Sequence, residues 1–302
     1  MSDRLTVLKT YKLYVGGKFP RSESGRVYEV TDGKSGEWLA NAPLSSRKDG
    51  RDAVVAARKA FGAWSGATAY NRGQVLYRVA EMLEGRREQF VREVSAAEGL
   101  GTSSKSGTAK AAAVVDAAID RWVWYAGWTD KIGQVVGGAN PVAGPFLNLS
   151  TPEPTGVVAV LAPQDSSFLG LISVIAPVIA SGNTVVVITS EKSPLPALSL
   201  GEVLATSDVP GGVVNILSGK ASEIAPSLAA HQDVNGIDLT GADAELAKQL
   251  EIAAADNLKR VRRPQPVDDF TADPGTDRLT YFLETKTVWH PTGSLGASGS
   301  AY

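Results

Sequence analysis

Between Thr155 and Val261 the chain alternates short apolar runs with helical stretches. Five runs rich in Val, Ile or Leu are too apolar to leave one face in water, which is typical of strands in a parallel sheet covered by helices on both sides. These runs are Val157–Leu161, Thr184–Ile188, Val213–Leu217, Asn235–Leu239 and Leu258–Val261. The pattern predicts an α/β fold built on a parallel sheet with flanking helices.

The first hundred residues predict a mixture of hairpins and helices. Gly16 and Gly17 lie between strand-forming residues and predict a tight hairpin over 14–19. A second strand pair is expected at 27–30 and 38–42. Periodic apolar positions predict a helix over 49–64 and one longer helix from Val75 to Val94, ended by glycines at 99–101.

A third helix is predicted from Ala111 to about Lys131, and the patch 101–110 before it is either mobile or leads into that helix. This helix carries Trp122, Trp124, Tyr125 and Trp128, a cluster that favours core or subunit-interface packing over a ligand cage. The Gly- and Pro-rich segment 134–153 predicts a projecting loop and strand, an arm of the kind often used for docking.

Composition narrows the classes of function. The 302 residues allow one large or two medium domains, and the absence of cysteine excludes disulfides, thiolate metal sites and thiol nucleophiles. A formal charge of -2 provides no field for a polyanion, so nucleic acid and anionic membranes are not expected partners. We find neither an export signal nor 18 uninterrupted apolar residues, and therefore expect a cytoplasmic protein.

The residues available for acid, base or metal chemistry are few. With only His231 and His290 in the chain, no metal site is expected. His231 fits the end of a helix, where the dipole favours a cation, and His290 fits a surface or an interface. Ser166 and Ser167 have no identifiable base, so neither is assigned as a nucleophile.

In an open parallel sheet, ligands bind beyond the carboxyl ends of the strands. The segments at that edge are Ala162–Asp165, Thr189–Glu191, Ser218–Gly219 and Thr240–Ala242. None of them matches the glycine-rich dinucleotide motif or the P-loop. Spacing alone therefore indicates a nucleotide-type sheet without a nucleotide motif.

Several motifs together resemble the aldehyde dehydrogenase superfamily. The segments that resemble its cofactor domain are Gly156–Pro163, Ile175–Pro177, Ala180–Val186, Pro210–Asn215 and Thr240–Gly241. The likeness extends back through 57–64 and the hairpin at 14–19. It reappears at Tyr281–Trp289, which is similar to the C-terminal oligomerisation strand of the family. The resemblance implies a Rossmann-like NAD-binding domain with a β oligomerisation arm.

The resemblance also implies a division of the chain into domains. Residues 1–133 and 155–261 would form the NAD-binding-like α/β domain, and residues 134–154 and 278–292 the oligomerisation arm. Residues 262–277 would be a linker in place of the catalytic domain, and residues 293–302 a flexible tail. The chain is thus expected to be a shortened member that lacks the catalytic domain.

The residues that catalyse the reaction of the family would be absent together with that domain. In the family a cysteine thiolate attacks the aldehyde, hydride passes to NAD(P), and a glutamate activates water. After Val261 this chain continues into a proline-broken polar segment instead of the segment with that glutamate. Asp165 stands where an asparagine should stabilise the oxyanion, and a carboxylate would repel it. No residue is therefore assigned a catalytic role.

The resemblance places a cofactor site at Pro163, Glu191, Gly219, Thr240 and Gly241. Two neighbours depart from the family, because Ile188 replaces a lysine and Ala242 replaces a serine. Asp243 and Glu245 oppose a pyrophosphate at the start of the following helix. Gly219, Thr240 and Gly241 fit turn and packing roles equally well. We expect weak NAD(P) binding or none.

Two classes of function compete. The first is a catalytically inactive structural or regulatory subunit that forms a homo-oligomer or pairs with a full-length aldehyde dehydrogenase paralogue. An unpartnered arm would leave a strand edge and apolar surface exposed, which favours this class. The alternative is a subunit of an NAD(P)-dependent aldehyde oxidoreductase whose catalytic domain is supplied in trans. A free-standing nucleotide-binding module is a third class, and it requires measurable NAD affinity.

Overall fold

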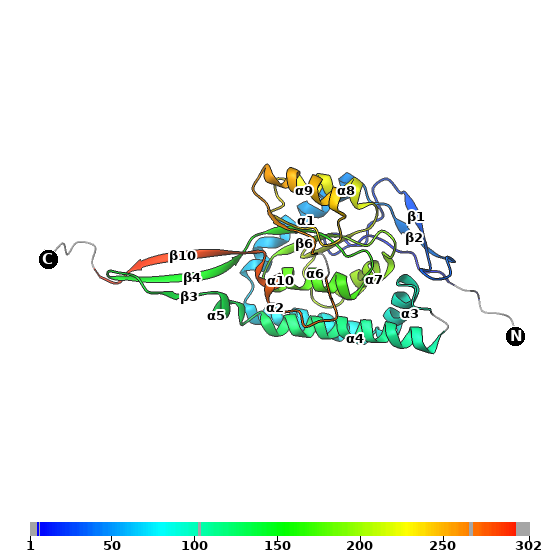
Figure 1. The fold of residues 1–302 in the computed structure, drawn as a ribbon, viewed down its shortest axis with the longest axis horizontal. Coiled ribbons are helices and arrows are strands. Elements are labelled where there is room, and N and C mark those ends of the chain that lie inside the picture. Colours follow the sequence, from blue (N-terminus) through cyan, green and yellow to red (C-terminus); the bar gives the residue numbers. More distant parts are fainter. Residues whose placement is uncertain (1–4, 6, 102–103, 266–267, 294–302) are drawn as a thin grey trace.

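The structure is a computed structural model that describes residue 5 and residues 7–101, 104–265 and 268–293. Figure 1 shows a helix-covered body from which a narrow arm of strands extends. The predicted flexible tail lies outside the described residues apart from Gly293. No helix of the described segments is both long and apolar enough to cross a membrane.

The body is organised around a five-stranded sheet in which all neighbouring strands are parallel. Its spatial order is β7-β6-β5-β8-β9. The strands are β5 (Val157–Leu161), β6 (Thr184–Ile188), β7 (Val214–Leu217), β8 (Gly236–Asp238) and β9 (Arg260–Arg262). The predicted α/β fold and its parallel sheet are confirmed, with strand ends shifted by one or two residues at the last three strands.

Both faces of the sheet are buried, because alternate residues of each strand enter different cores. Val158 and Val160 pack into one core, and Val157, Ala159 and Leu161 pack into the other. The second core is covered by α1 (Arg47–Gly66), α8 (Ala221–Ala229) and α9 (Ala244–Ala255). The first is covered by α2 (Ala69–Glu84), α3 (Arg87–Ala97), α4 (Lys105–Trp128), α6 (Leu169–Ala180) and α7 (Leu195–Leu204).

The single helix predicted across Val75–Val94 is wrong, because α2 and α3 are separate helices. The break falls at Gly85 and Arg86, and Arg86 has a non-helical backbone (φ -116°, ψ 11°). Glycine weakens a helix interior. Its neighbour Arg86 forms an ion pair with Glu202 of α7 at 3.3 Å. This contact links the turn to α7, against which α3 also packs.

Helix α4 begins earlier than predicted, at Lys105, where the Ser104 side chain accepts a hydrogen bond from the Gly107 amide at 2.9 Å. Ser104 is a favourable N-cap because its hydroxyl pairs an amide that the helix leaves free. Trp122 and Tyr125 of this helix are fully buried, and Trp124 and Trp128 pack partly buried against the same core. The aromatic cluster is therefore part of the core.

The predicted N-terminal hairpins are both present. Val15 and Lys18 exchange backbone hydrogen bonds at 3.0 Å across Gly16 and Gly17, which have positive φ. The preceding residue, Tyr14, bridges to Ile216 of β7. The hairpin therefore adds a short contact at one edge of the sheet. Strands β1 (Val27–Thr31) and β2 (Trp38–Pro43) form the second antiparallel pair.

The arm is a three-stranded antiparallel sheet of order β10-β4-β3. It consists of β3 (Gly138–Asn140), β4 (Phe146–Pro154) and β10 (Leu283–Pro291), preceded by the short α5 (Ile132–Val136). Figure 1 shows it extending away from the body. Between β9 and β10 the chain forms one short helix, α10 (Asp277–Thr280).

Candidate functional site at the carboxyl edge of the sheet

The five residues predicted to bind a cofactor follow four parallel strands, so the fold places all of them at one edge of the sheet. Pro163 follows β5, Glu191 follows β6, Gly219 follows β7, and Thr240 and Gly241 follow β8. The chain reverses its direction of strand addition between β5 and β8, which is where open α/β sheets usually bind ligands. A role in cofactor binding stays a prediction for each of them.

The loops after β5, β6 and β7 are joined through Glu191. Its amide donates to the Gln164 side chain at 3.0 Å, and its carboxylate accepts from the Ala221 amide at 2.6 Å. Ala221 is the first residue of α8. The Glu191 carboxylate thus pairs an otherwise free amide at a helix N-terminus, where negative charge is favoured.

Gly241 and Gly219 are closely packed. Gly241 donates its amide to the Leu161 carbonyl at 2.9 Å, and a Cβ at this position would overlap the Ala162 carbonyl. Gly219 has φ +131°, and a Cβ there would lie 3.1 Å from the Ser45 amide nitrogen. The packing role that the sequence allowed for both glycines therefore has a direct steric basis.

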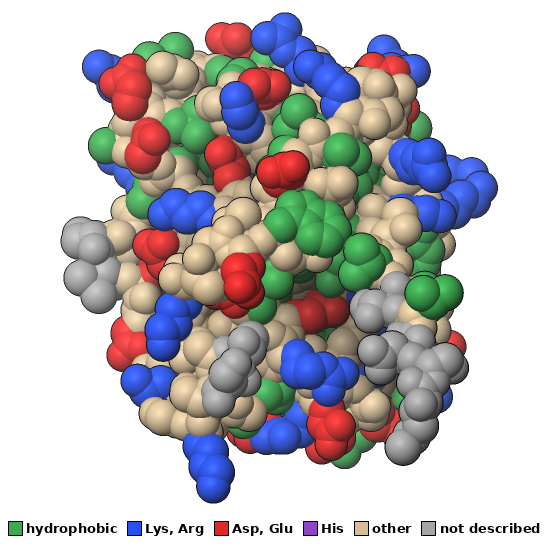
Figure 2. All heavy atoms as spheres, turned by 90° about the vertical axis from the view of Figure 1, so that its right-hand side faces the viewer, with side chains coloured by type: hydrophobic (Ala, Val, Ile, Leu, Met, Phe, Trp, Pro, Cys, Tyr) green, Lys and Arg blue, Asp and Glu red, His purple; other side chains and the backbone are tan. Residues whose placement is uncertain are grey.

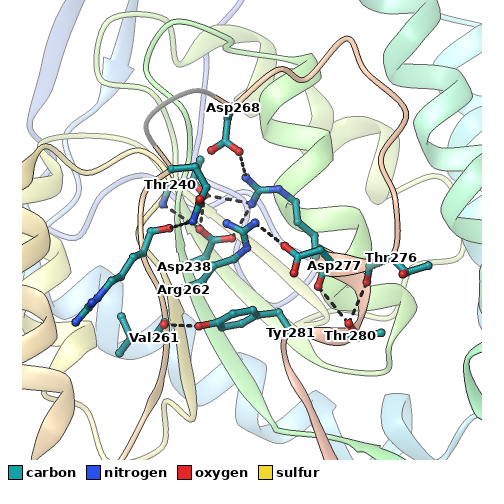
Figure 3. A network of polar contacts seen from close by, with 12 residues as sticks. Asp238, Thr240, Val261, Arg262, Asp268, Thr276, Asp277, Thr280 and Tyr281 are labelled. Carbon is teal, nitrogen blue, oxygen red and sulfur yellow. Dashed lines mark hydrogen bonds and ion pairs between the residues drawn. The ribbon is translucent and has the colours of Figure 1, made fainter. Parts of the chain in front are cut away.

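Residues 263–280, which we call the strap, connect β9 to the base of the arm and cross the carboxyl end of β8; the structure describes all of them except 266 and 267. The Arg278 guanidinium lies 3.1 Å from Asp238 at the end of β8 and 2.9 Å from Asp268. It also donates to the Thr240 hydroxyl at 3.2 Å. The Arg278 and Asp238 side chains are only 10% and 3% exposed. Figure 3 shows Asp238, Thr240 and Asp268 converging in this network.

Further contacts fix the strap on both sides. Arg262 donates to Asp277 at 2.9 Å, and the Tyr281 hydroxyl donates to the Val261 carbonyl at 2.6 Å (Figure 3). Arg121 of α4 donates to the Phe270 carbonyl at 2.7 Å. The chain therefore closes the carboxyl ends of β8 and β9 with its own side chains.

Glu98, at the C-terminal end of α3, holds the loop that follows β5. Both the amide and the hydroxyl of Ser167 donate to the Glu98 carboxylate at 2.9 Å, and the Ser166 hydroxyl accepts from the Gly170 amide at 2.9 Å. Burial raises the pKa of Glu98, although the bonds from Ser167 oppose that change. Both serine hydroxyls thus have structural partners.

The remaining polar positions lie apart from this cluster. The Asp165 side chain is 94% exposed and lies 3.6 Å from Lys192. His231 follows the end of α8, as predicted, and its Nδ1 accepts from the Asp233 amide at 3.1 Å. His290 lies exposed in β10 of the arm. Within the described residues, no group of three or more Asp, Glu or His side chains is arranged to hold a metal ion.

The residues at this edge fit a dinucleotide pyrophosphate poorly. Asp243 caps the N-terminus of α9 by accepting from the Leu246 amide at 2.8 Å, and Glu191 pairs the first amide of α8. A phosphate at either helix start would meet a carboxylate instead of free amides. The Thr240 hydroxyl also donates to Asp238 at 2.5 Å, so it is already engaged.

The architecture is an open parallel α/β sheet of the dinucleotide-binding type with an attached β arm. The profile of the aldehyde dehydrogenase family matches residues 19–263, which is most of the chain. The chain belongs to the aldehyde dehydrogenase family.

Curated relatives agree with this assignment. The chain is 31% identical over 255 residues to a putative aldehyde dehydrogenase, DhaS, of Bacillus subtilis strain 168, covering 83% of this chain and 50% of that protein. It is 34% identical to retinal dehydrogenase 2 of Gallus gallus, covering 84% of this chain and 48% of that protein. The chain thus spans about half the length of the curated relatives it matches.

Solved structures show the same partial coverage. HpcC from Thermus thermophilus matches with a TM-score of 0.77 and 30% identity, over 84% of this chain and 47% of that one. An NAD⁺ complex of aldehyde dehydrogenase from Bacillus cereus matches with a TM-score of 0.76 and 25% identity, over 84% of this chain and 50% of that one. This chain therefore shares its fold with about half of each of these solved structures.

Sequence reasoning missed the strap network and the Glu98 contact. Asp238 and Arg278 are distant in sequence, and the strap carries no periodic pattern that would pair its charges with the sheet. The only available signal was the presence of Asp268, Asp277 and Arg278 in a segment interpreted as a polar linker. Their partners follow from the tertiary fold.

Replacing Arg278 with Leu is expected to lower the free energy of unfolding by about 3–5 kcal/mol, because the Asp238 carboxylate would remain buried without a partner of opposite charge. Urea denaturation at pH 7 measures this change. The double variant Arg278→Leu/Asp238→Leu should recover much of the loss.

The matched control for Arg278→Leu is Arg78→Leu, which breaks the exposed Arg78–Glu81 pair. This control should change stability by about 1 kcal/mol or less. A loss of that small size for Arg278→Leu would contradict the role given to the buried pair.

The Glu98→Gln variant tests the buried carboxyl. Because burial raises the pKa of Glu98, its stabilising contribution is complete below the unfolded pKa of about 4.3 and is lost as pH rises through the folded pKa. The variant should match the parent near pH 4 and be more stable at pH 7. Urea denaturation across this range measures the difference, with the exposed Glu37→Gln as control. A less stable variant at pH 7 would refute the assignment.

Proposed function

We propose that this chain is a catalytically inactive member of the aldehyde dehydrogenase family that acts as a structural or regulatory subunit. It assembles with itself or with a full-length aldehyde dehydrogenase. One observation carries the proposal: β10 pairs with β4 along the whole arm, although only residues 263–282 separate β10 from β9. The chain returns to its arm across a short strap, at the point where the resemblance places a catalytic domain.

The residue types in the chain support the proposed catalytic inactivity. The chain contains no cysteine, so it supplies no thiolate to attack an aldehyde. After Val261, where the resemblance places the glutamate base, Arg262 enters the ion pair with Asp277. The two reactive groups expected of the family therefore have no counterpart in this sequence.

The arm supports the proposal that this chain assembles with another chain. It keeps strands from two distant parts of the chain, and the residues of β10 from Glu284 to His290 are all exposed. If no other chain contacted the arm, the backbone groups along this strand edge would stay unpaired and prone to non-specific association. Figure 2 shows that acidic and basic side chains are interspersed at the opposite end of the molecule, so a polyanionic partner is not favoured there.

The second candidate is an aldehyde oxidoreductase subunit that receives its catalytic domain from a partner chain. The α/β body favours this candidate, because it resembles a protein solved with NAD⁺ bound. The carboxylates at the starts of α8 and α9 disfavour it, for the electrostatic reason given above. We therefore rank it second, and we retain the cytoplasm as the proposed location.

Binding of NAD(P) is proposed to be weak or absent. Calorimetric titration of the purified protein with NAD and NADP should give no saturable heat, because the pyrophosphate would meet Glu191 and Asp243. A dissociation constant below about 100 μM would contradict this expectation.

The purified protein is expected to show no aldehyde-dependent reduction of NAD or NADP with a panel of small aldehydes. A full-length member of the family serves as the positive control. Light scattering, on the protein alone and mixed with that full-length member, should show assembly in at least one case. Turnover by the protein alone would overturn the catalytic part of the proposal, and a monomer in both samples would overturn the assembly part.

A further inference from the structure

A cleft with a volume of about 950 Å³ lies between the end of α9, β9 and Tyr281. None of the five predicted cofactor residues is among the described residues that line it. One wall holds Arg263 of the strap, which bonds through two nitrogens to Glu251 of α9 at 3.0 and 2.9 Å. Because these two side chains neutralise each other, the ligand preference of the cleft depends on the groups around them.

Lys259 is a buried cation in the wall of the cleft, and only 8% of the residue is exposed. Its ammonium donates to the side-chain carbonyl of Asn257, and within the described residues it forms no ion pair. Burial lowers the pKa of Lys259, although the charge of Asp256 opposes that change. The ammonium has thus lost part of its hydration, and an anion in the cleft would compensate for that loss.

A second buried cation, Arg262, lines the same cleft, with 6% of the residue exposed. Its guanidinium pairs with Asp277 and lies over the Tyr281 ring, 5.7 Å from the ring centroid (Figure 3). The Asp277 side chain is 76% exposed, so water screens this pair. In the part of the chain that the structure describes, Nε and Nη1 of Arg262 have no hydrogen-bond partner. Since buried donors in native proteins are nearly always paired, this arginine indicates a ligand that carries an acceptor.

The apolar part of the cleft includes Leu258, which is 92% exposed and has a positive φ of 56°. The Leu258 amide donates to the Ala255 carbonyl at 3.2 Å, and the Lys259 amide donates to the Ala254 carbonyl at 3.2 Å. Glycine usually occupies the left-handed position of this helix-ending motif. A leucine there strains the backbone and exposes apolar surface, so neither local conformation nor packing within the chain favours it.

We propose that this cleft binds a small organic acid, whose carboxylate faces Lys259 and Arg262 and whose apolar body contacts Leu258. Ala255 and Val261 complete the apolar wall. The carboxylate accepts charge-assisted hydrogen bonds, which are stronger than those between neutral groups. A neutral molecule of the same shape gains only the apolar contact and leaves the buried ammonium without a counter-charge. This site goes beyond the proposed function and does not depend on it.

The charge balance of the cleft favours a monoanion. Its described lining residues carry a net charge of +1, from the three cations Lys259, Arg262 and Arg263 and the two carboxylates Glu251 and Asp277. One carboxylate neutralises this charge. A doubly charged phosphate would bring an excess negative charge towards the two acidic side chains, which is unfavourable.

Saturation-transfer difference NMR of the full chain with benzoate, a monoanion with an apolar ring, tests the proposal. Binding should saturate with a dissociation constant of about 1 mM. Neutral benzamide has nearly the same shape and should bind about tenfold more weakly, because it leaves the ammonium of Lys259 without a counter-charge.

Three variants locate the binding. Lys259→Gln removes the charge but keeps a donor for Asn257, so it should fold and bind benzoate about tenfold more weakly. Lys248→Gln is the matched control, because Lys248 is exposed on α9 outside the cleft, and its affinity should stay within about twofold of the parent. Leu258→Gly separates binding from folding, since glycine relieves the left-handed strain. It should raise the Tm of the free protein and still weaken benzoate binding several-fold.

Every outcome bears on the site. Saturable benzoate binding that weakens in Lys259→Gln and Leu258→Gly but not in Lys248→Gln supports it. Binding that does not saturate below about 20 mM benzoate would overturn it. Equal affinity for benzoate and benzamide would overturn the carboxylate as the recognised group. Equal losses in the two lysine variants would show that binding follows net charge and would overturn the cleft as its location. Circular dichroism checks that all three variants are folded.

Discussion

The ion pair between Arg278 and Asp238 joins the end of β8 to the strap, and the arrangement of the C-terminal part of the chain depends on it. Both side chains are nearly fully buried. An uncompensated buried charge costs several kcal/mol, which is a large fraction of the roughly 5–15 kcal/mol that stabilises a typical domain. The guanidinium therefore stays over the end of β8, and the strap leads directly to the start of β10.

This constraint explains how half of a larger family architecture forms a closed unit. The loops after β5, β6 and β7 are joined through Gln164 and Glu191, and the strap covers the ends of β8 and β9. Glu191, Asp238 and Thr240 at this edge each bond to other groups of the chain. The arm keeps its strands because the strap returns the chain to β4. A scaffold that keeps the arm and contains no cysteine is the physical basis of the proposed subunit role.

Sequence reasoning predicted the features that depend on local pattern. The five strands were recognisable because their apolar runs exceed what a half-solvated strand carries, and Gly16 and Gly17 indicated the first hairpin. The break at Gly85 and Arg86 was missed because the contact of Arg86 with Glu202 is tertiary. The strap ion pairs were missed for the same reason. The division into domains and the cofactor role of the five edge residues stay predictions.

The most direct test of the central claim is native-state hydrogen exchange of the sheet. If the strap completes the fold, the hydrogen-bonded amides of β8 and β9 should exchange only through global unfolding, with the same opening free energy as those of β5 and β6. Exchange of β8 and β9 through a local opening several kcal/mol below the global value would show that the strap does not close the sheet, and would contradict this account.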